Sequence, residues 1–247
     1  LKISAYYTNS QADSSFKYAL LSQKLAEKLN YQKFHIEALE YLGRAQAGKG
    51  LFQEALVTFK KEELLAKDHA EKAQTIRNQG NIYIELGRQK EAMDAYLRSL
   101  EIARLSKHQL TIAISLSNIG YAYRQQSEYE KAISYLLEAL KIGEEIKNNY
   151  LIAGIYTQLA LIQYNRKAHK EAIQYATQAE NIYSKTNNLQ GRATALTILG
   201  GSYSELNNLP ETKRYIEEAY KVNMALGDKR QIYTAAKNLA EVELALN

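Results

Sequence analysis

Histidine is the side chain best suited to bind a metal ion or to move a proton near neutral pH, and this sequence contains four. They are His35, His69, His108 and His169. A metal site needs three or four ligands that converge on one point, whereas no two of these histidines stand four residues apart on one helix face. Because cysteine is absent, thiolate ligands and cysteine nucleophiles are excluded as well. We therefore expect surface or helix-end histidines and no metal site.

Three pairs of adjacent glutamates raise the question of acid–base catalysis, which requires carboxyl groups that face one reacting atom. The pairs are Glu62–Glu63, Glu144–Glu145 and Glu217–Glu218. Neighbouring residues on a helix point about 100° apart, so we interpret each pair as part of a solvated helix face. The sequence also lacks a glycine-rich phosphate loop, a GxSxG elbow and an HExxH helix. We expect neither catalysis nor a cofactor.

The composition favours long helices around a sizeable core. Of the 247 residues, 46% are hydrophobic and 24% are charged, and a single proline with 12 glycines leaves few places to interrupt a helix. No run of 18 or more apolar residues occurs, so the sequence predicts no segment that inserts into a membrane. Cytoplasm and periplasm are both compatible with these totals.

The formal net charge of +5 raises the question of nucleic-acid binding. Lysine and arginine are interleaved with aspartate and glutamate, as in "EKAISYLLEALKIGEEIK", and form no basic block. Such interleaving is typical of a solvated surface of mixed charge. A helical-repeat RNA binder would also repeat one side-chain code in every unit, and this chain does not. We expect no nucleic-acid partner.

A pattern of small and apolar residues recurs along the chain. We call the small residue in its first half the anchor; the anchors are Gly43, Gly80, Gly120, Ala160, Gly200 and Ala240. The first spacing is 37 residues and the other four are 40. A second small residue follows twelve positions later, at Ala55, Ala92, Ala132 and Ala172, with Thr212 as the exception. A fixed period of this size predicts stacked supersecondary units.

Each unit is predicted to be a pair of helices. In the third unit, Leu116, Ile119 and Tyr123 form an apolar stripe at helical spacing, and the polar break "RQQSEY" separates them from a second apolar run. A glycine inside a helix costs about 1 kcal/mol relative to alanine. That cost is tolerable where two helix axes approach closely, so the anchors predict tight packing of the two helices in each pair.

Segments such as "IGYAY" and "LGGSY", followed by alanine at the start of the second helix, resemble tetratricopeptide repeats. That family has a usual period of about 34 residues, and the 40-residue period resembles its longer branch, found in signalling scaffolds and bacterial regulators. The resemblance implies an all-α, right-handed superhelical solenoid of about six units, with residues 1–247 as a single domain. HEAT-type repeats share the length but lack this signature.

The ends of the sequence suggest a fragment of a longer protein. The segment "DSSFKYALLSQKLAEKLN", residues 13–30, reads as the second helix of a further unit whose first helix would begin at residue 1. It resembles repeats that precede histidine-kinase or DNA-binding output domains in bacterial signalling proteins. The resemblance therefore implies an interaction module in signal transduction.

Each first helix has a second face whose composition the core does not explain. On a helical wheel, the positions three and two before the anchor, and one and four after it, lie nearly opposite the core stripe. The candidate binding residues there are Tyr41, Arg44, Arg77, Asn78, Asn81, Ser117, Asn118, Tyr121, Arg124, Gln158, Tyr164 and Asn238. Amides can pair with a peptide backbone, tyrosines offer contact area and arginines bind carboxylates. The resemblance places this face in a concave groove, where we predict a protein or peptide partner.

Two alternatives accompany this prediction. The amides can simply solvate an exposed face, or the chain can self-associate through its apolar last helix, which carries Leu239, Val242, Leu244 and Leu246. Part of the face also resembles the carboxylate clamp of co-chaperone tetratricopeptide domains, by the placement of Arg77, Asn81 and Asn118. The match then fails, because Gly154 and Gln158 stand where that clamp has two basic groups.

Overall fold

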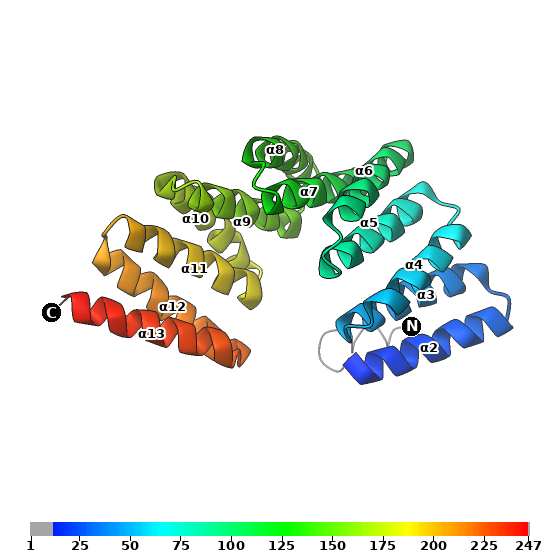
Figure 1. Ribbon diagram of the computed structural model, residues 1–247, viewed down its shortest axis with the longest axis horizontal. Coiled ribbons are helices and arrows are strands. Elements are labelled where there is room, and N and C mark those ends of the chain that lie inside the picture. The colour runs from blue at the N-terminus through cyan, green and yellow to red at the C-terminus, as the bar shows by residue number, and fades with distance from the viewer. Residues whose placement is uncertain (1–11, 247) are drawn as a thin grey trace. The chain divides into compact units, whose positions relative to one another are not determined.

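The computed structural model describes residues 12–246, and these form twelve α-helices without a strand (Figure 1). The helices are α2 (Ala12–Lys28), α3 (Gln32–Gly48), α4 (Phe52–Leu65), α5 (His69–Glu85), α6 (Gln89–Ser106), α7 (Gln109–Gln125), α8 (Tyr129–Glu145), α9 (Asn149–Asn165), α10 (His169–Lys185), α11 (Leu189–Glu205), α12 (Leu209–Leu226) and α13 (Lys229–Leu246). The predicted all-α fold and the second helix near residues 13–30 are confirmed. The helix predicted to begin at residue 1 lies outside the described residues.

The chain divides into two compact units, residues 1–122 and 123–247, with the boundary inside α7. Within each unit, helices that are consecutive in the chain pack side by side: α3 on α4 and α5 on α6 in the first, α9 on α10 and α11 on α12 in the second (Figure 1). The helix pairs predicted from the repeats are therefore present in both units. The single domain over residues 1–247 stays a prediction.

A residue with a left-handed backbone closes most helices at a fixed interval. Positive φ angles recur at Lys107, Ser127, Lys147, Lys167, Asn187, Asn207 and Gly227. These positions are 20 residues apart, so one helix and its turn fill half of the 40-residue repeat. In the turn after α9, the N–H of Ala168 donates to the carbonyl of Gln163 at 2.9 Å, the bond that closes a helix followed by a left-handed residue.

The single 37-residue spacing has its origin in the connection between α4 and α5. α4 has only 14 residues, and Ala66 after it is extended, with ψ of 119°. Asp68 then caps α5 by accepting hydrogen bonds from the backbone N–H groups of Ala70 and Glu71. An extended connection thus replaces the left-handed turn of the other units and shortens the repeat.

The left-handed turns lead to a test of local stability. Lys167 has a φ of 61°, a conformation that strains any residue with a Cβ atom. We expect Lys167→Gly to raise the free energy of unfolding by about 0.5–1 kcal/mol, measured by urea denaturation. Lys141→Gly, at an exposed position inside α8, should instead lower it by about 1 kcal/mol. A destabilised Lys167→Gly protein would contradict this account of the turns.

The anchor glycines allow large side chains to pack directly on the first helix. A Cβ atom placed on Gly43 would lie 2.6 Å from Cε1 of Phe59, and one on Gly80 would lie 2.5 Å from Cε1 of Tyr96. At Gly200 the nearest atom is Cγ1 of Ile216, at 3.1 Å. The predicted close packing of the two helices is confirmed at these three anchors.

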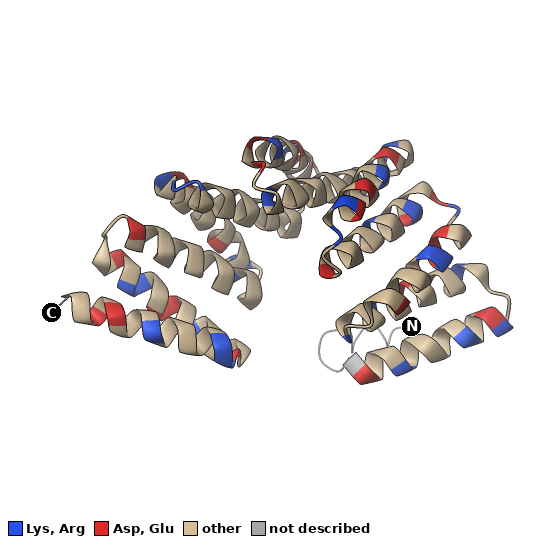
Figure 2. Ribbon diagram, viewed as in Figure 1, with Lys and Arg blue, Asp and Glu red and all other residues tan. Residues whose placement is uncertain are grey.

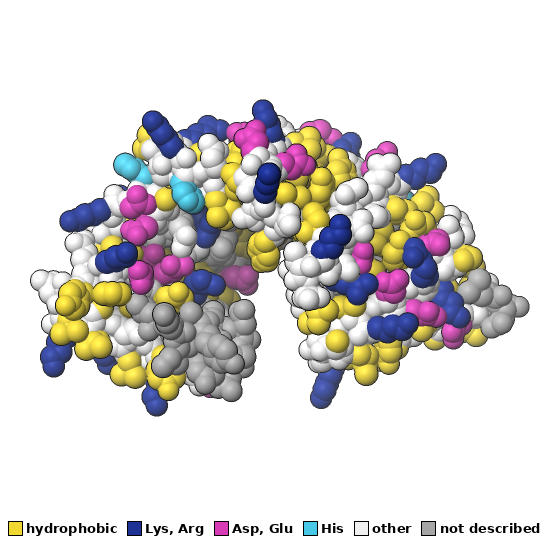
Figure 3. Space-filling model, turned by 180° about the vertical axis from the view of Figure 1, so that it is seen from behind, with side chains coloured by type: hydrophobic (Ala, Val, Ile, Leu, Met, Phe, Trp, Pro, Cys, Tyr) yellow, Lys and Arg dark blue, Asp and Glu magenta, His cyan; other side chains and the backbone are white. Residues whose placement is uncertain are grey.

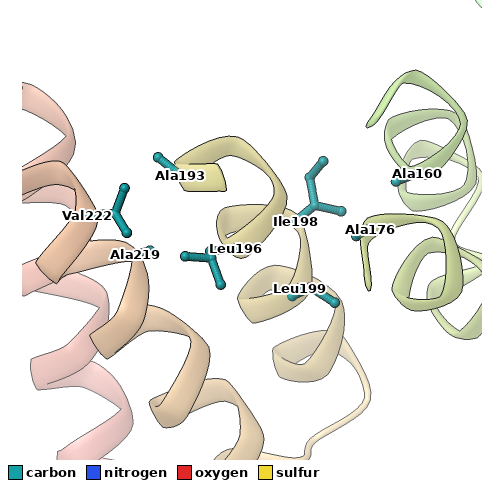
Figure 4. Close-up of a cluster of buried hydrophobic side chains, with 8 residues drawn as sticks. All are labelled: Ala160, Ala176, Ala193, Leu196, Ile198, Leu199, Ala219 and Val222. Atoms are coloured by element: carbon teal, nitrogen blue, oxygen red, sulfur yellow. The ribbon is translucent and has the colours of Figure 1, made fainter. Parts of the chain in front are cut away.

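The core of the second unit shows how one helix contacts two others. α11 directs Leu196 toward Ala219 of α12, and Ile198 toward Ala160 of α9 and Ala176 of α10 (Figure 4). All of these side chains are buried. A first helix therefore uses two sides for packing.

Charged side chains of both signs are mixed along the helices (Figure 2) and over the face seen in Figure 3. Many lie within ion-pair distance; Arg192, for example, contacts Glu180 at 2.8 Å and Glu218 at 3.1 Å. The predicted surface of mixed charge is confirmed. No helix in the described part of the chain has the length and apolar character needed to cross a bilayer.

Candidate binding surfaces

The predicted binding residues lie on the helices that carry the anchors, α3, α5, α7, α9 and α13, but they differ in exposure. Arg44, Asn81 and Asn238 are exposed. Asn78 and Ser117 are buried and leave little surface for a partner. The other seven are half-buried, namely Tyr41, Arg77, Asn118, Tyr121, Arg124, Gln158 and Tyr164. Ten of the twelve side chains are therefore at least partly accessible.

Hydrogen bonds organise the polar residues of α3 and α5 in the first unit. A guanidinium nitrogen of Arg77 donates to Oδ1 of Asn78 at 3.3 Å. On α3, Glu40 pairs with Arg44 at 3.6 Å and accepts a hydrogen bond from Nε2 of Gln74 at 2.8 Å. These contacts hold the Glu40 carboxylate beside Arg44 and Gln74.

Tyr96 lies beside these polar residues, although the helical wheel of the first helices did not include it. It belongs to α6, a second helix, yet its hydroxyl donates to Oδ1 of Asn81 at 2.7 Å. The pKa of Tyr96 lies well above its usual value. Burial is the largest cause, and the nearby Tyr121 raises the pKa further. The hydroxyl is therefore protonated at neutral pH and acts as a hydrogen-bond donor.

We call Glu40, Arg44, Arg77, Asn81, Tyr96 and Tyr121 the first-unit cluster. Burial lowers the pKa of Arg77, while Glu40 raises it and Arg44 lowers it. The six residues include two guanidinium groups and one carboxylate, which gives the cluster a net positive formal charge. Such an arrangement can accept a carboxylate or a peptide carbonyl.

In the second unit, a groove of about 560 Å³ runs between α9, α11, α12 and α13. Two of the predicted residues, Tyr164 and Asn238, line it. Gln158 and Arg124 do not. Most of the remaining lining comes from α11 and α13, which carry anchors, and four residues come from α12, a second helix that a helical wheel of the first helices does not describe.

The structure corrects the interpretation of Glu62 and Glu63 as part of a solvated face. Glu62 is 2% exposed, and Thr75 donates a hydrogen bond to one of its carboxyl oxygens at 2.6 Å. The other oxygen has no partner among the described residues. Burial raises the pKa of Glu62 to about 8, so this carboxyl is mostly protonated at neutral pH. Neighbouring Glu63 accepts a hydrogen bond from Gln79 at 2.8 Å and pairs with Arg98.

The other singled-out titratable residues are less unusual. Glu144 and Glu145 are exposed, while Glu217 and Glu218 are half-buried and contact Lys213 and Arg192. His69 and His169 begin α5 and α10, and His108 directly precedes α7. Within residues 12–246, no three histidine or acidic side chains are grouped so that they could hold a metal ion.

Family models match two stretches of the chain. Both describe a tetratricopeptide repeat, one over residues 111–185 and the other over residues 73–104. Together they cover the helices from within α5 through α10, and the first match spans the boundary between the two compact units. A comparison with curated proteins found no match.

Solved structures with the same fold come from different kinds of protein. BtubC from P. vanneervenii is 16% identical with a TM-score of 0.76, and the match covers 89% of this chain and 93% of BtubC. Aspartyl phosphate phosphatase F from Bacillus subtilis is 18% identical with a TM-score of 0.72, covering 86% and 57%. A signal transduction ATPase with a tetratricopeptide repeat sensor, from Pyrococcus horikoshii, is 20% identical with a TM-score of 0.61, covering 95% and 46%. At these identities the likeness shows the fold alone.

Proposed function

Since the chain belongs to the tetratricopeptide repeat family, we propose that it is a non-enzymatic module that binds a peptide segment of another protein. Proteins of this fold serve as interaction scaffolds. The partner binds on the face of the anchor-bearing helices that is not used for packing. The module acts in signal transduction; in support, one of the similar structures is itself a signal transduction ATPase with a repeat sensor.

The observation that carries this proposal is the first-unit cluster. Arg44 forms an ion pair with Glu40, whereas the guanidinium of Arg77 donates a hydrogen bond to Asn78, so the positive charge of Arg77 supports recognition of an acidic group of a partner. Tyr121 and Asn81 supply contact area and hydrogen-bonding groups beside it. A solvated face with no binding role would not require a half-buried arginine held among partners.

A capture experiment tests this site. The chain is immobilised and exposed to lysate of its source organism, in parallel with the triple variant Arg77→Ala, Asn118→Ala, Tyr121→Ala. A matched control replaces three exposed lysines on second helices, Lys60, Lys90 and Lys170, with alanine. Circular dichroism first verifies that each variant is folded.

We expect a partner that the wild-type chain and the lysine control retain and the triple variant loses. The loss should exceed about tenfold, since a half-buried arginine and a tyrosine are typical hot-spot residues. A partner that all three proteins retain equally would place recognition elsewhere and would contradict the proposed site.

Self-association is a second candidate function, because the anchor of α13 is not covered. Ala240 is exposed, whereas the other five anchors are buried. Tyr233 and Leu244 on the same helix are 72% and 79% exposed. If two copies associate through this face, the mass in solution will fall on dilution; Leu244→Lys should then keep the protein monomeric at every concentration.

A further inference from the structure

The groove in the second unit has apolar walls. Ile198 of α11, Ala219 of α12, and Ala235 and Val242 of α13 line it and are buried. Gly201 of α11 allows Tyr164 to pack closely at the wall of the groove, since a Cβ atom on Gly201 would lie 3.3 Å from the Tyr164 hydroxyl. Its volume of about 560 Å³ falls in the range of pockets that enclose a ligand group.

One buried polar group lines this apolar groove. Asn223, in the last turn of α12, is 3% exposed. Its backbone carbonyl accepts a hydrogen bond from the N–H of Asp228 at 3.3 Å, and the residue lines the groove. A side-chain amide offers one donor and one acceptor group to a ligand, as a peptide backbone does.

The charge at the edge of the groove is negative. Among the described residues that line it, the charged ones are Glu205 of α11 and Glu241 of α13. Glu205 has no ion-pair partner within the described chain, and Glu241 has only Lys237, at 3.7 Å on the surface of its own helix. An exposed pair of this kind contributes little, so both carboxylates are available to a cation.

We propose that this groove binds an extended segment of a partner protein that carries a bulky apolar side chain next to lysine or arginine. The apolar side chain packs on the apolar walls of the groove, a peptide group of the segment pairs with the amide of Asn223, and the cation approaches Glu205 and Glu241. The inference deepens the peptide-binding function proposed above and rests on it.

The same features exclude other segments. An acidic residue beside the apolar side chain would face Glu205 without a compensating cation, and such like-charge contacts oppose binding. A segment without a bulky side chain would leave the apolar walls unfilled. The first-unit cluster, with Arg44 and Arg77, has the opposite charge preference, so the two sites can be distinguished by the composition of the segments that they select.

A display selection tests the inference while the partner is still unidentified. Random segments of about 12 residues, flanked on both sides by Gly-Ser linkers so that no free terminus is needed, are selected on the full chain. We expect enriched segments that place an aromatic or large aliphatic residue beside lysine or arginine. Fluorescence anisotropy then measures the affinity of one enriched segment for each variant.

The double variant Glu205→Lys, Glu241→Lys is expected to weaken binding by about tenfold or more, and Gly201→Leu should weaken it similarly by filling the groove. The two glutamates are exposed on helix surfaces, so the double variant tests the inference even if Gly201→Leu fails to fold. As a matched control, Glu54→Lys, Glu145→Lys reverses two exposed charges elsewhere and should leave the affinity unchanged.

The outcomes separate this inference from the function on which it rests. The inference would be wrong if an enriched segment bound the Glu205→Lys, Glu241→Lys and Gly201→Leu variants as tightly as wild type but bound Arg77→Ala more weakly. That result would leave the peptide-binding function standing. A selection that enriches no segment would count against both.

Discussion

Replacing Glu62 with glutamine is expected to remove a large loss of stability on going from pH 5 to pH 9. In the folded chain, burial raises the pKa of this carboxyl to about 8, compared with 4.5 for the free side chain. Between these values the folded state holds a proton that the unfolded state has released. The free energy of unfolding therefore falls as the pH rises toward 8.

The size of the effect follows from the same shift. Each pKa unit corresponds to about 1.4 kcal/mol, so the wild-type chain should lose on the order of 4 kcal/mol over this range because of Glu62 alone. Glutamine has the same shape, can still accept the hydrogen bond from Thr75 and cannot ionise. The variant should be similar to wild type at pH 5 and clearly more stable at pH 9.

Urea denaturation at both pH values, followed by circular dichroism, measures this difference. Glu54→Gln serves as the control, because it removes one carboxyl group at an exposed position on the same helix. If the Glu62→Gln and wild-type chains lose stability equally between pH 5 and pH 9, then Glu62 is not held protonated in the core.

The second large effect is expected for Gly80→Ala. The added Cβ atom would overlap the ring of Tyr96, which is 1% exposed and cannot move into solvent. We expect the free energy of unfolding to fall by about 1–3 kcal/mol. Movement of Tyr96 would also disturb its 2.7 Å hydrogen bond to Asn81, so binding at the first-unit cluster should weaken as well.

Gly154→Ala provides a matched control for this substitution. Gly154 lies inside α9, and a Cβ atom there would have no neighbour within 4 Å. Alanine at this position should stabilise the protein by about 0.5–1 kcal/mol through its greater helix propensity. Equal effects at the two glycines, measured by thermal unfolding, would show that the anchor does not govern helix packing.

The helix pairs can be predicted from the sequence because they depend on local patterns. Apolar spacing, the small anchors and the polar breaks repeat in every unit, and each acts over a few residues. Even the single 37-residue interval is visible in the sequence, although its cause, the extended Ala66 in place of a left-handed turn, is not. The left-handed lysines at positions 107, 147 and 167 could not be predicted, because lysine carries no local signal for that conformation.

The candidate sites depend on tertiary structure to a greater degree. A helical wheel identifies which residues share a face, and it places Arg77 and Tyr121 on the faces that carry the first-unit cluster. It cannot show that Tyr96 reaches Asn81 from a second helix, that Asn223 of α12 lines a groove together with residues of first helices, or that Glu62 is buried while Glu54 is not. Exposure is set by helices that lie tens of residues away in the chain. The sequence by itself thus determined the repeating helix pair, and only the packing of these helices decided which polar side chains are buried, paired or available to a partner.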